Sequence, residues 1–219
     1  MSTNESAQTK PRVKADHSGA YIAWYTEIEN NNNNTSDIHA QKVIFSQDDP
    51  IQWQENGLLL CEADDVQTDV RLSVDNQGGV YFVWQDDRNG GSNADVYLQH
   101  VGSDNQFTYE SGGKIISDAA LIQKSPVVRN DGAGGAFIIW EDKRAGSGAI
   151  YVQHMDYMSD ISFEEDGKFI YYGTDGESLN INAVSIDSNK SLLYWEDHEQ
   201  GGLTKTFGKI ISEGYGNSY

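Results

Sequence analysis

The fold is decided by the stretch Val70-Arg-Leu-Ser-Val-Asp75-Asn-Gln-Gly78-Gly79-Val-Tyr-Phe-Val-Trp84-Gln-Asp86-Asp-Arg88. The segments on either side of Asp75–Gly79 are rich in β-branched and aromatic residues, which pack well on a pleated surface. The Asp-x-x-Gly-Gly element predicts a hairpin turn, because glycine adopts positive φ at no steric cost and aspartate bonds to its own downstream backbone. The run Val80–Trp84 is continuously apolar, which is typical of a strand covered on both faces. The stretch therefore predicts two antiparallel strands, the second of them buried.

The same pattern recurs four times, each time in register with a tryptophan. The copies align on Trp24, Trp84, Trp140 and Trp195, which are 60, 56 and 55 residues apart. A second β-rich block follows in the first three copies, at 37–43, 95–101 and 149–155, and a third block is looser. Each copy therefore predicts about four strands joined by turns.

A four-stranded sheet repeated at this period is typical of the blades of a β-propeller. One such sheet cannot hide both of its faces, and radial stacking buries each face on a neighbour, with the repeated tryptophan between blades. A two-layer β-sandwich competes, but it does not require a regular period. The sequence predicts an all-β fold, a β-propeller or propeller segment of four degenerate four-stranded blades of about 55–60 residues. We expect residues 1–219 to form one domain or partial propeller, with repeats at roughly 7–63, 64–119, 120–175 and 176–219.

Charge and composition narrow the range of partners. The chain carries 34 acidic and 15 basic residues, a formal charge of −19, so a phosphate backbone would be repelled and nucleic acid is not expected as a partner. No apolar run is long enough to span a membrane. A single cysteine, Cys61, excludes an internal disulfide and follows an apolar run, which indicates a buried thiol. The opening residues Met1–Ser6 lack the basic and apolar regions of a signal peptide.

The pattern Asp-x-x-Gly-Gly-x-x-x-x-Trp-x-Asp-x-Arg, followed by Asp-Ile/Val-Tyr-x-Gln, resembles the propeller repeats of bacterial secreted and cell-surface proteins. It is similar, more distantly, to TolB-like and sialidase-like propellers. The match is best at 84–99 and 140–153; it weakens in the first copy, where Tyr25-Thr-Glu-Ile replaces the Asp and Arg, and in the fourth, which lacks the Arg. The resemblance implies a propeller, a secreted or cell-surface location and a binding or scaffolding role, but no single activity.

Two pairs of charged residues follow the core tryptophans, Asp86 with Arg88 and Asp142 with Arg144. They are predicted to be either a repeated structural ion pair or turn cap, or part of a charged rim around a ligand. Repetition favours the structural role, because catalytic residues are usually unique.

Arg12 and Arg71 occupy equivalent positions, four residues before the turn aspartate. A sialidase-like site would need several arginines converging on a carboxylate, but the third and fourth copies have Val127 and Ala183 there, and Arg129 is two residues out of register. We therefore take Arg12 and Arg71, with the two Asp/Arg pairs, as candidate binding residues and assign no catalytic residue.

Metal binding has weak support in the sequence. Calcium is conceivable at Asp64-Asp65 or Asp86-Asp87, yet no stretch matches the twelve-residue loop of alternating oxygen ligands. Two of the five histidines, His100 and His154, recur after equivalent glutamines, which indicates strand residues rather than a zinc site. No cofactor is expected.

The leading hypothesis from the sequence is a non-enzymatic secreted or cell-surface module that binds a protein or glycan, or serves as a scaffold. The first alternative is a sialidase-like glycan hydrolase, which leaves enzymatic activity open. A second is an incomplete piece of a larger propeller protein, because the fourth copy shows only three strands. An open blade edge would then favour self-association.

Overall fold

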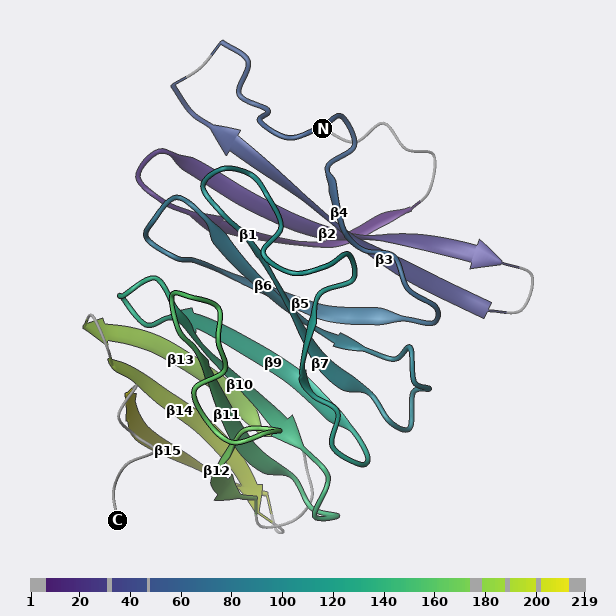
Figure 1. Cartoon of the computed structure of the whole chain (residues 1–219). Coiled ribbons are helices and arrows are strands. Elements are labelled where there is room, and N and C mark those ends of the chain that lie inside the picture. Colours follow the sequence, from purple (N-terminus) through teal and green to yellow (C-terminus); the bar gives the residue numbers. More distant parts are fainter. Residues whose placement is uncertain are drawn as a thin grey trace.

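The computed structural model describes residues 7–30, 33–46, 48–173, 179–187, 190–199 and 202–212, and in them four antiparallel sheets succeed one another along the chain (Figure 1). The first six residues, whose lack of signal-peptide features was noted above, lie outside this set. The sheets are blade 1, with β1 (Gln8–Ala15), β2 (Gly19–Asn30), β3 (Asn33–Ile44) and β4 (Leu58–Cys61); blade 2, with β5 (Gln67–Val74), β6 (Val80–Asp86), β7 (Asp95–Val101) and β8 (Lys114–Ser117); blade 3, with β9 (Gln123–Asn130), β10 (Ala136–Asp142), β11 (Ala149–Met155) and β12 (Lys168–Tyr172); and blade 4, with β13 (Asn180–Asp187), β14 (Lys190–Glu199) and β15 (Leu203–Ser212).

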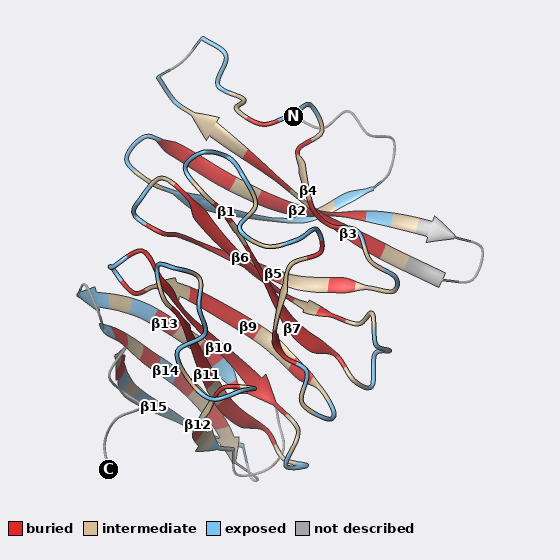
Figure 2. Cartoon of the chain, viewed as in Figure 1, coloured by how far each residue is buried: buried red, intermediate tan, exposed pale blue. Residues whose placement is uncertain are grey.

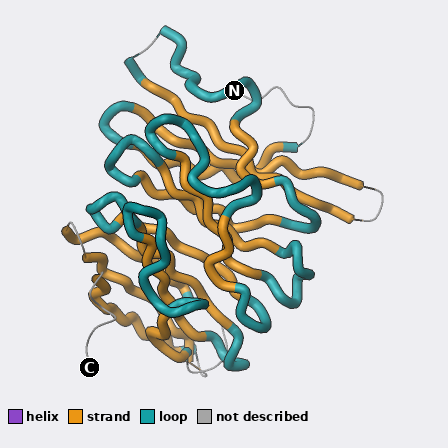
Figure 3. The backbone as a smooth tube through the Cα atoms, viewed as in Figure 1, coloured by secondary structure: helices purple, strands orange, loops and turns teal. Residues whose placement is uncertain are grey.

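Every sheet is a simple meander, with strands hydrogen-bonded in their sequence order. The backbone tube contains strands and loops and no helix among the described residues (Figure 3), so no helix there is long and apolar enough to cross a membrane. This arrangement confirms the predicted all-β propeller fold.

The blades are stacked face to face in an arc that runs from blade 1 to blade 4 (Figure 1). The first strands of successive blades contact one another, β1 with β5, β5 with β9 and β9 with β13, so these are the inner strands. Buried residues concentrate in the second and third strands of blades 2 and 3, whereas β15 is largely exposed (Figure 2). The central blades therefore supply most of the core.

Each core tryptophan packs toward the blade that precedes it. Trp84 belongs to the apolar cluster between blades 1 and 2, Trp140 to that between blades 2 and 3, and Trp195 to that between blades 3 and 4. Trp24, in the first blade, lies in none of these clusters. The repeated tryptophan thus fills the space between blades, as expected from the repeat.

The Asp-x-x-Gly-Gly turns are fixed by their own aspartate. Asp131 Oδ1 accepts the N–H groups of Ala133 and Gly135 at 2.7 and 2.9 Å, and Asp131 Oδ2 lies 2.9 Å from His154 Nε2. Asp75 and His100 repeat this contact in blade 2 at 3.0 Å. The pattern explains why a histidine recurs on the third strand of these two blades.

Two apolar faces at the ends of the arc have no blade against them in the described part of the chain. On blade 4, Val184 pairs with Leu192 and Leu192 with Ile210, and the side chains of Val184 and Ile210 are 49% and 55% exposed. On blade 1, Ile22 and Trp24 lie beside a cavity with an apolar lining. Self-association through such a face stays a prediction.

A glycine before the fourth strand makes room for the core tryptophan, and its replacement tests the packing. Gly113 has φ +81°, and a Cβ added there would lie 2.4 Å from Trp84 Cη2. We expect Gly113→Ala to lower the free energy of unfolding by at least about 2 kcal/mol, from backbone strain and displacement of the ring. Gly90→Ala is the control, because φ is also positive (+92°) but no atom lies within 4 Å; it should cost only about 1 kcal/mol. Equal losses in urea unfolding would contradict this account.

Candidate functional site

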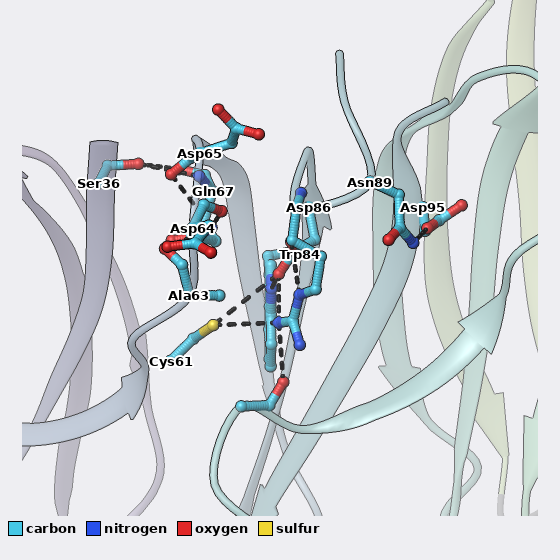
Figure 4. Close-up of polar contacts among 12 residues, drawn as sticks. Ser36, Cys61, Ala63, Asp64, Asp65, Gln67, Trp84, Asp86, Asn89 and Asp95 are labelled. Carbon is cyan, nitrogen blue, oxygen red and sulfur yellow. Dashed lines mark hydrogen bonds and ion pairs between the residues drawn. The ribbon is translucent and has the colours of Figure 1, made fainter. Parts of the chain in front are cut away.

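In blades 2 and 3 each Asp/Arg pair forms a buried set of contacts with the core tryptophan and a tyrosine of the third strand. We call this set of contacts the lock. Asp86 is fully buried, and its Oδ2 accepts Trp84 Nε1–H at 2.8 Å, while its Oδ1 accepts Arg88 Nε–H at 2.8 Å (Figure 4). The Arg88 guanidinium lies 3.9 Å from the centre of the Tyr97 ring and donates to the Gly112 carbonyl at 3.1 Å. Asp86 therefore ties the second strand of the blade to its third strand and to the loop before its fourth.

Blade 3 repeats the lock in every part. Trp140 Nε1 donates to Asp142 Oδ2 at 2.9 Å, and Arg144 Nη2 lies 2.6 Å from the same oxygen. The Arg144 guanidinium lies 4.0 Å from the centre of the Tyr151 ring and donates to the Asp166 carbonyl. All four predicted residues are thus occupied by contacts within their blades and with the last strand of the preceding blade, where Arg88 contacts Cys61 and Arg144 contacts Ser117. A ligand-binding role for them stays a prediction.

Arg12 and Arg71 lie elsewhere, on the inner strands β1 and β5. Arg71 Nη1 is 2.6 Å from Asp69 Oδ1, with both side chains about a third exposed or less. Arg12 is exposed, and its side chain makes no hydrogen bond or ion pair with another residue in the described ranges. Both arginines act electrostatically on Tyr25 of β2, whose hydroxyl accepts the Val70 N–H. Arg12 and Arg71 thus lie on inner strands that contact one another, β1 and β5, whereas the two Asp/Arg pairs lie at the ends of second strands.

A groove opens between blades 1 and 2, at the end of the propeller where β2 ends and β5 begins. It joins two cavities of about 240 and 450 Å³ that share Ile28 and Thr35, and we call it the blade 1–2 groove. The first cavity is also lined by Thr9, Lys10, Tyr25, Glu27, Ser36, Val66, Gln67 and Thr68, and the second by Asp37, Glu62, Ala63 and Asp64. Hydroxyls, an amide, carboxylates and one aromatic ring thus line a single concave surface.

Hydrogen bonds connect the two blades along the wall of the groove. Ser36 Oγ donates to the Gln67 carbonyl at 2.7 Å and accepts the Gln67 N–H at 2.9 Å (Figure 4). The Gln67 amide donates in turn to the Asp64 carbonyl at 3.1 Å. These hydrogen bonds join β3 to the start of β5 and hold both walls of the groove in place.

Asp37, at the start of the second block in copy 1, is the most unusual side chain of the groove. The residue is only 9% exposed, and its carboxyl makes no hydrogen bond with another described residue. Burial raises the pKa of the Asp37 carboxyl, and the negative charge of Glu62 raises it further. The equivalent residue of blade 2, Asp95, accepts a hydrogen bond from Asn89 at Oδ2 at 2.7 Å, whereas its Oδ1 is buried without a partner among the described residues, and burial raises its pKa as well. The Asp37 oxygens are not among the fully buried polar atoms that lack a hydrogen-bond partner, and the residue lines the second cavity of the groove.

The sequence-based reasoning missed Asp37 and Glu62 as site residues. Asp37 was recognised only as the start of a repeated block, and the signal that set copy 1 apart was the replacement of Asp and Arg by Tyr25-Thr-Glu-Ile. This replacement removes the lock from blade 1: Thr26 stands where Asp86 stands in blade 2, and Trp24 Nε1 has no hydrogen-bond partner among the described residues.

Metal binding gains no support from these positions. Both carboxylate oxygens of Asp86 already accept N–H groups, so Asp86 is not available to calcium. Among the described residues, no three His, Cys, Asp or Glu side chains are grouped as metal ligands, and this holds at Asp64-Asp65 as well.

Comparison with known proteins bears on the fold. No protein-family model and no curated protein matches the sequence, whereas 28 solved chains match the structure. One is a candidate glycosidase from Bacteroides thetaiotaomicron, with a TM-score of 0.52, 12% identity, and 95% of this chain aligned to 70% of that chain. Another is a glycosyl hydrolase from Bacteroides ovatus, with a TM-score of 0.51 and 11% identity, and with 95% of this chain and 68% of that chain covered.

A third similar structure comes from the GH130 family of mannoside phosphorylases, which contains glycoside hydrolases that target β-1,2 mannosidic linkages in Candida mannan. Its TM-score is 0.51 at 10% identity, over 95% of this chain and 67% of that chain. At this low identity the comparison shows the fold alone: this chain shares the β-propeller of glycoside hydrolases, which is five-bladed in that fold, and its described residues form four blades.

These similarities bear on two expectations. The predicted resemblance to a propeller is confirmed, with glycoside hydrolases as the similar structures, while its TolB-like, sialidase-like and secreted or cell-surface parts stay predictions. The leading hypothesis of a non-enzymatic interaction module is wrong, because the proteins that share this fold are described as glycoside hydrolases or phosphorylases. The repetition of the Asp/Arg pairs had favoured a structural role for these residues. Repetition describes how the blades are built, and it does not bear on the function of the groove beside them.

The lock offers a direct test of stability. We expect Asp86→Ala to lower the free energy of unfolding by roughly 3 kcal/mol, because it leaves the Arg88 guanidinium and Trp84 Nε1 without their shared acceptor. Asp87→Ala removes a neighbouring carboxylate that accepts only Gln85 Nε2 and should change stability by less than about 0.5 kcal/mol. Similar denaturation midpoints for the two variants would show that Asp86 does not hold the blade together.

Proposed function

We propose that this chain is a glycan-active enzyme that cleaves glycosidic bonds in the blade 1–2 groove. The observation that carries the proposal is Asp37, a buried carboxyl with no hydrogen-bond partner among the described residues, a raised pKa and a cavity of about 450 Å³ beside it. The similarity of the fold to glycoside hydrolases supports the same conclusion. A secreted or cell-surface location, expected from the sequence, fits an enzyme that meets polysaccharides.

Glycoside cleavage requires a carboxylic acid that still holds its proton when the substrate binds, so that it can protonate the departing oxygen. Burial and the adjacent Glu62 charge both favour the protonated form of Asp37. We therefore assign Asp37 as the general acid. Its proton goes to the glycosidic oxygen as the bond from that oxygen to the anomeric carbon breaks.

The second carboxylate of the pair is Glu62, which lines the same cavity, is exposed to solvent and lies close enough to influence Asp37. An ionised carboxylate on the opposite side of the scissile bond stabilises the developing positive charge at the anomeric carbon, or activates the water or phosphate that attacks it. A pair of carboxyl groups whose environments separate their proton affinities is the arrangement this chemistry needs.

The adjoining cavity of about 240 Å³ provides the contacts that hold a neighbouring sugar. Thr9 Oγ1 donates to Glu27 Oε1 at 2.8 Å, which orients the Glu27 carboxylate at the mouth of the groove. The Tyr25 ring offers an apolar surface beside it. Sugars present both hydroxyls and apolar C–H faces, so a cavity with several hydroxyls, one aromatic ring and two charged side chains, Lys10 and Glu27, matches their chemistry.

The test compares Asp37 with its counterpart in blade 2. We expect the full chain to release reducing sugar or sugar phosphate from at least one member of a polysaccharide panel, assayed with and without inorganic phosphate. Asp37→Asn should lower kcat by at least about 100-fold, because it removes the proton donor while keeping the shape. Asp95→Asn is the matched control, since that aspartate holds the same position but is hydrogen-bonded by Asn89.

Two results would overturn the assignment. One is an Asp37→Asn variant with undiminished kcat, and the other is an equal loss in Asp95→Asn, which would point to a structural role shared by both blades. The melting temperatures of the two variants, measured alongside, separate a loss of chemistry from a loss of folding.

The pH dependence provides an independent test. Activity should fall on the alkaline side as Asp37 loses its proton, at a pH above the ordinary range of an aspartate. Glu62→Gln removes a negative charge that raises the pKa of Asp37, so the Asp37 carboxyl should titrate at lower pH in this variant. Because Glu62 is also assigned to the reaction, the measurement in Glu62→Gln is the NMR titration of the Asp37 carboxyl carbon, and a titration identical to that of the wild type would show that Glu62 does not act on the proton donor.

A further inference from the structure

The outer edge of blade 3 carries exposed aromatic rings. On β12, the centre of the Phe169 ring lies 4.3 Å from that of Tyr172 and 5.8 Å from that of Tyr151 on the neighbouring strand β11. Phe169 and Tyr172 are 40% and 53% exposed, and Tyr151 is half-buried. We call these three residues the blade 3 aromatic patch.

The packing of the blades does not require these exposed rings. The register of strand pairing aligns Phe169 with Leu59 of blade 1 and Ile115 of blade 2, and Tyr172 takes the place of an acidic residue in both of these blades. Neither Phe169 nor Tyr172 belongs to an apolar cluster between blades. Exposed apolar side chains that gather in one place without a role in packing indicate a binding surface.

Contacts with the core hold the rings of the patch in place. The Tyr151 ring stacks on the buried Trp140 at 6.2 Å, and the Arg144 guanidinium lies 4.0 Å from its centre. Phe169 meets Tyr151 edge-on, with 74° between the ring planes. Rings that are already held in one arrangement lose little conformational freedom when a ligand binds, which favours binding. The Arg144 side chain is 22% exposed, and its Nη1 makes no hydrogen bond with another described residue, so an N–H donor remains beside Tyr151.

The patch lies at the same end of the propeller as the blade 1–2 groove. Tyr172, the last residue of β12, pairs with Ala149, which pairs in turn with Asp142 at the end of the second strand of the blade. In blade 1 the place of Ala149 is held by Asp37, because Asp37 pairs with Thr26, the residue that aligns with Asp142. A long polymer bound in the groove can therefore extend across this end of the propeller toward the patch.

We propose that the blade 3 aromatic patch is a second binding surface for polysaccharide, separate from the groove, with a neutral chain of pyranose sugars as its ligand; this class of ligand rests on the proposed function. A pyranose ring presents an apolar C–H face that packs flat on an aromatic ring, and its hydroxyl oxygens accept N–H groups such as that at Arg144 Nη1. A neutral chain is favoured over an acidic one, because the protein carries a formal charge of −19.

The experiment measures the mobility of the full chain in native gels that contain soluble galactomannan, glucomannan or galactan, relative to a gel without polysaccharide. We expect at least one polysaccharide to retard the wild type. The double variant Phe169→Leu/Tyr172→Ser should bind that polysaccharide about fivefold more weakly, because it removes both exposed rings. Leucine is the residue of blade 1 at the position of Phe169, so the strand should still form.

Two further measurements locate the effect. Tyr157→Ala is the matched control, because Tyr157 is 67% exposed on the loop between β11 and β12 but its ring contacts no other ring among the described residues; it should leave the retardation unchanged. The double variant should keep the kcat of the wild type on a short oligosaccharide, because neither Phe169 nor Tyr172 lines the groove, whereas its KM for the polymer should rise.

Several results would overturn the inference: equal retardation of the wild type and the double variant, the same loss of retardation in Tyr157→Ala, or no retardation by any of the three polysaccharides. A wild type that is dimeric by light scattering and a double variant that is monomeric would also overturn it, because the rings would then form an interface between copies. Cleavage that depends on Asp37, without retardation that depends on the rings, would leave the proposed function standing. Retardation that depends on the rings, without cleavage of any polysaccharide, would overturn the proposed function alone.

Discussion

The structure depends on a buried carboxylate placed two residues after the core tryptophan of a blade. A buried charge is costly unless hydrogen bonds and an opposite charge compensate it. Asp86 meets this condition with the Trp84 indole N–H and the Arg88 guanidinium, which in turn stacks on Tyr97. The lock joins the second strand of the blade to its third strand and to the loop before its fourth, and it holds the tryptophan that packs against the preceding blade.

Blade 1 lacks this lock, and the groove lies at the same blade. Thr26 stands in place of the aspartate, the Trp24 indole N–H has no partner among the described residues, and the Arg position is taken by Ile28, which lines both cavities. Without a guanidinium over the strand end, the rim of blade 1 stays open, and Asp37 is left buried without a partner. The residues that build the propeller and those that we propose to act on a glycan are therefore separate sets, although the two positions are related by the repeat.

Much of the fold followed from the sequence, and little of the site did. The alignment of Trp24, Trp84, Trp140 and Trp195 predicted the sheets and their order, because each repeat needs the same turn and the same filler between blades. The proximity of Arg12 and Arg71 was indicated by their equivalent positions, but Arg129 was set aside as out of register. In the structure the Arg129 side chain donates to the Ala183 carbonyl of β13, so it bridges blades 3 and 4.

The sequence by itself determined the blade: where its strands and turns fall, which tryptophan is buried and which aspartate follows it, because these are local requirements repeated along the chain. Only the tertiary structure decided which repeat borders the groove. The proximity of Asp37 and Glu62 and the cavity that both line arise between segments distant in sequence. The sequence of copy 1 shows that the Asp and Arg of the repeat are missing. Which residues and cavities take their place depends on how the neighbouring blades pack.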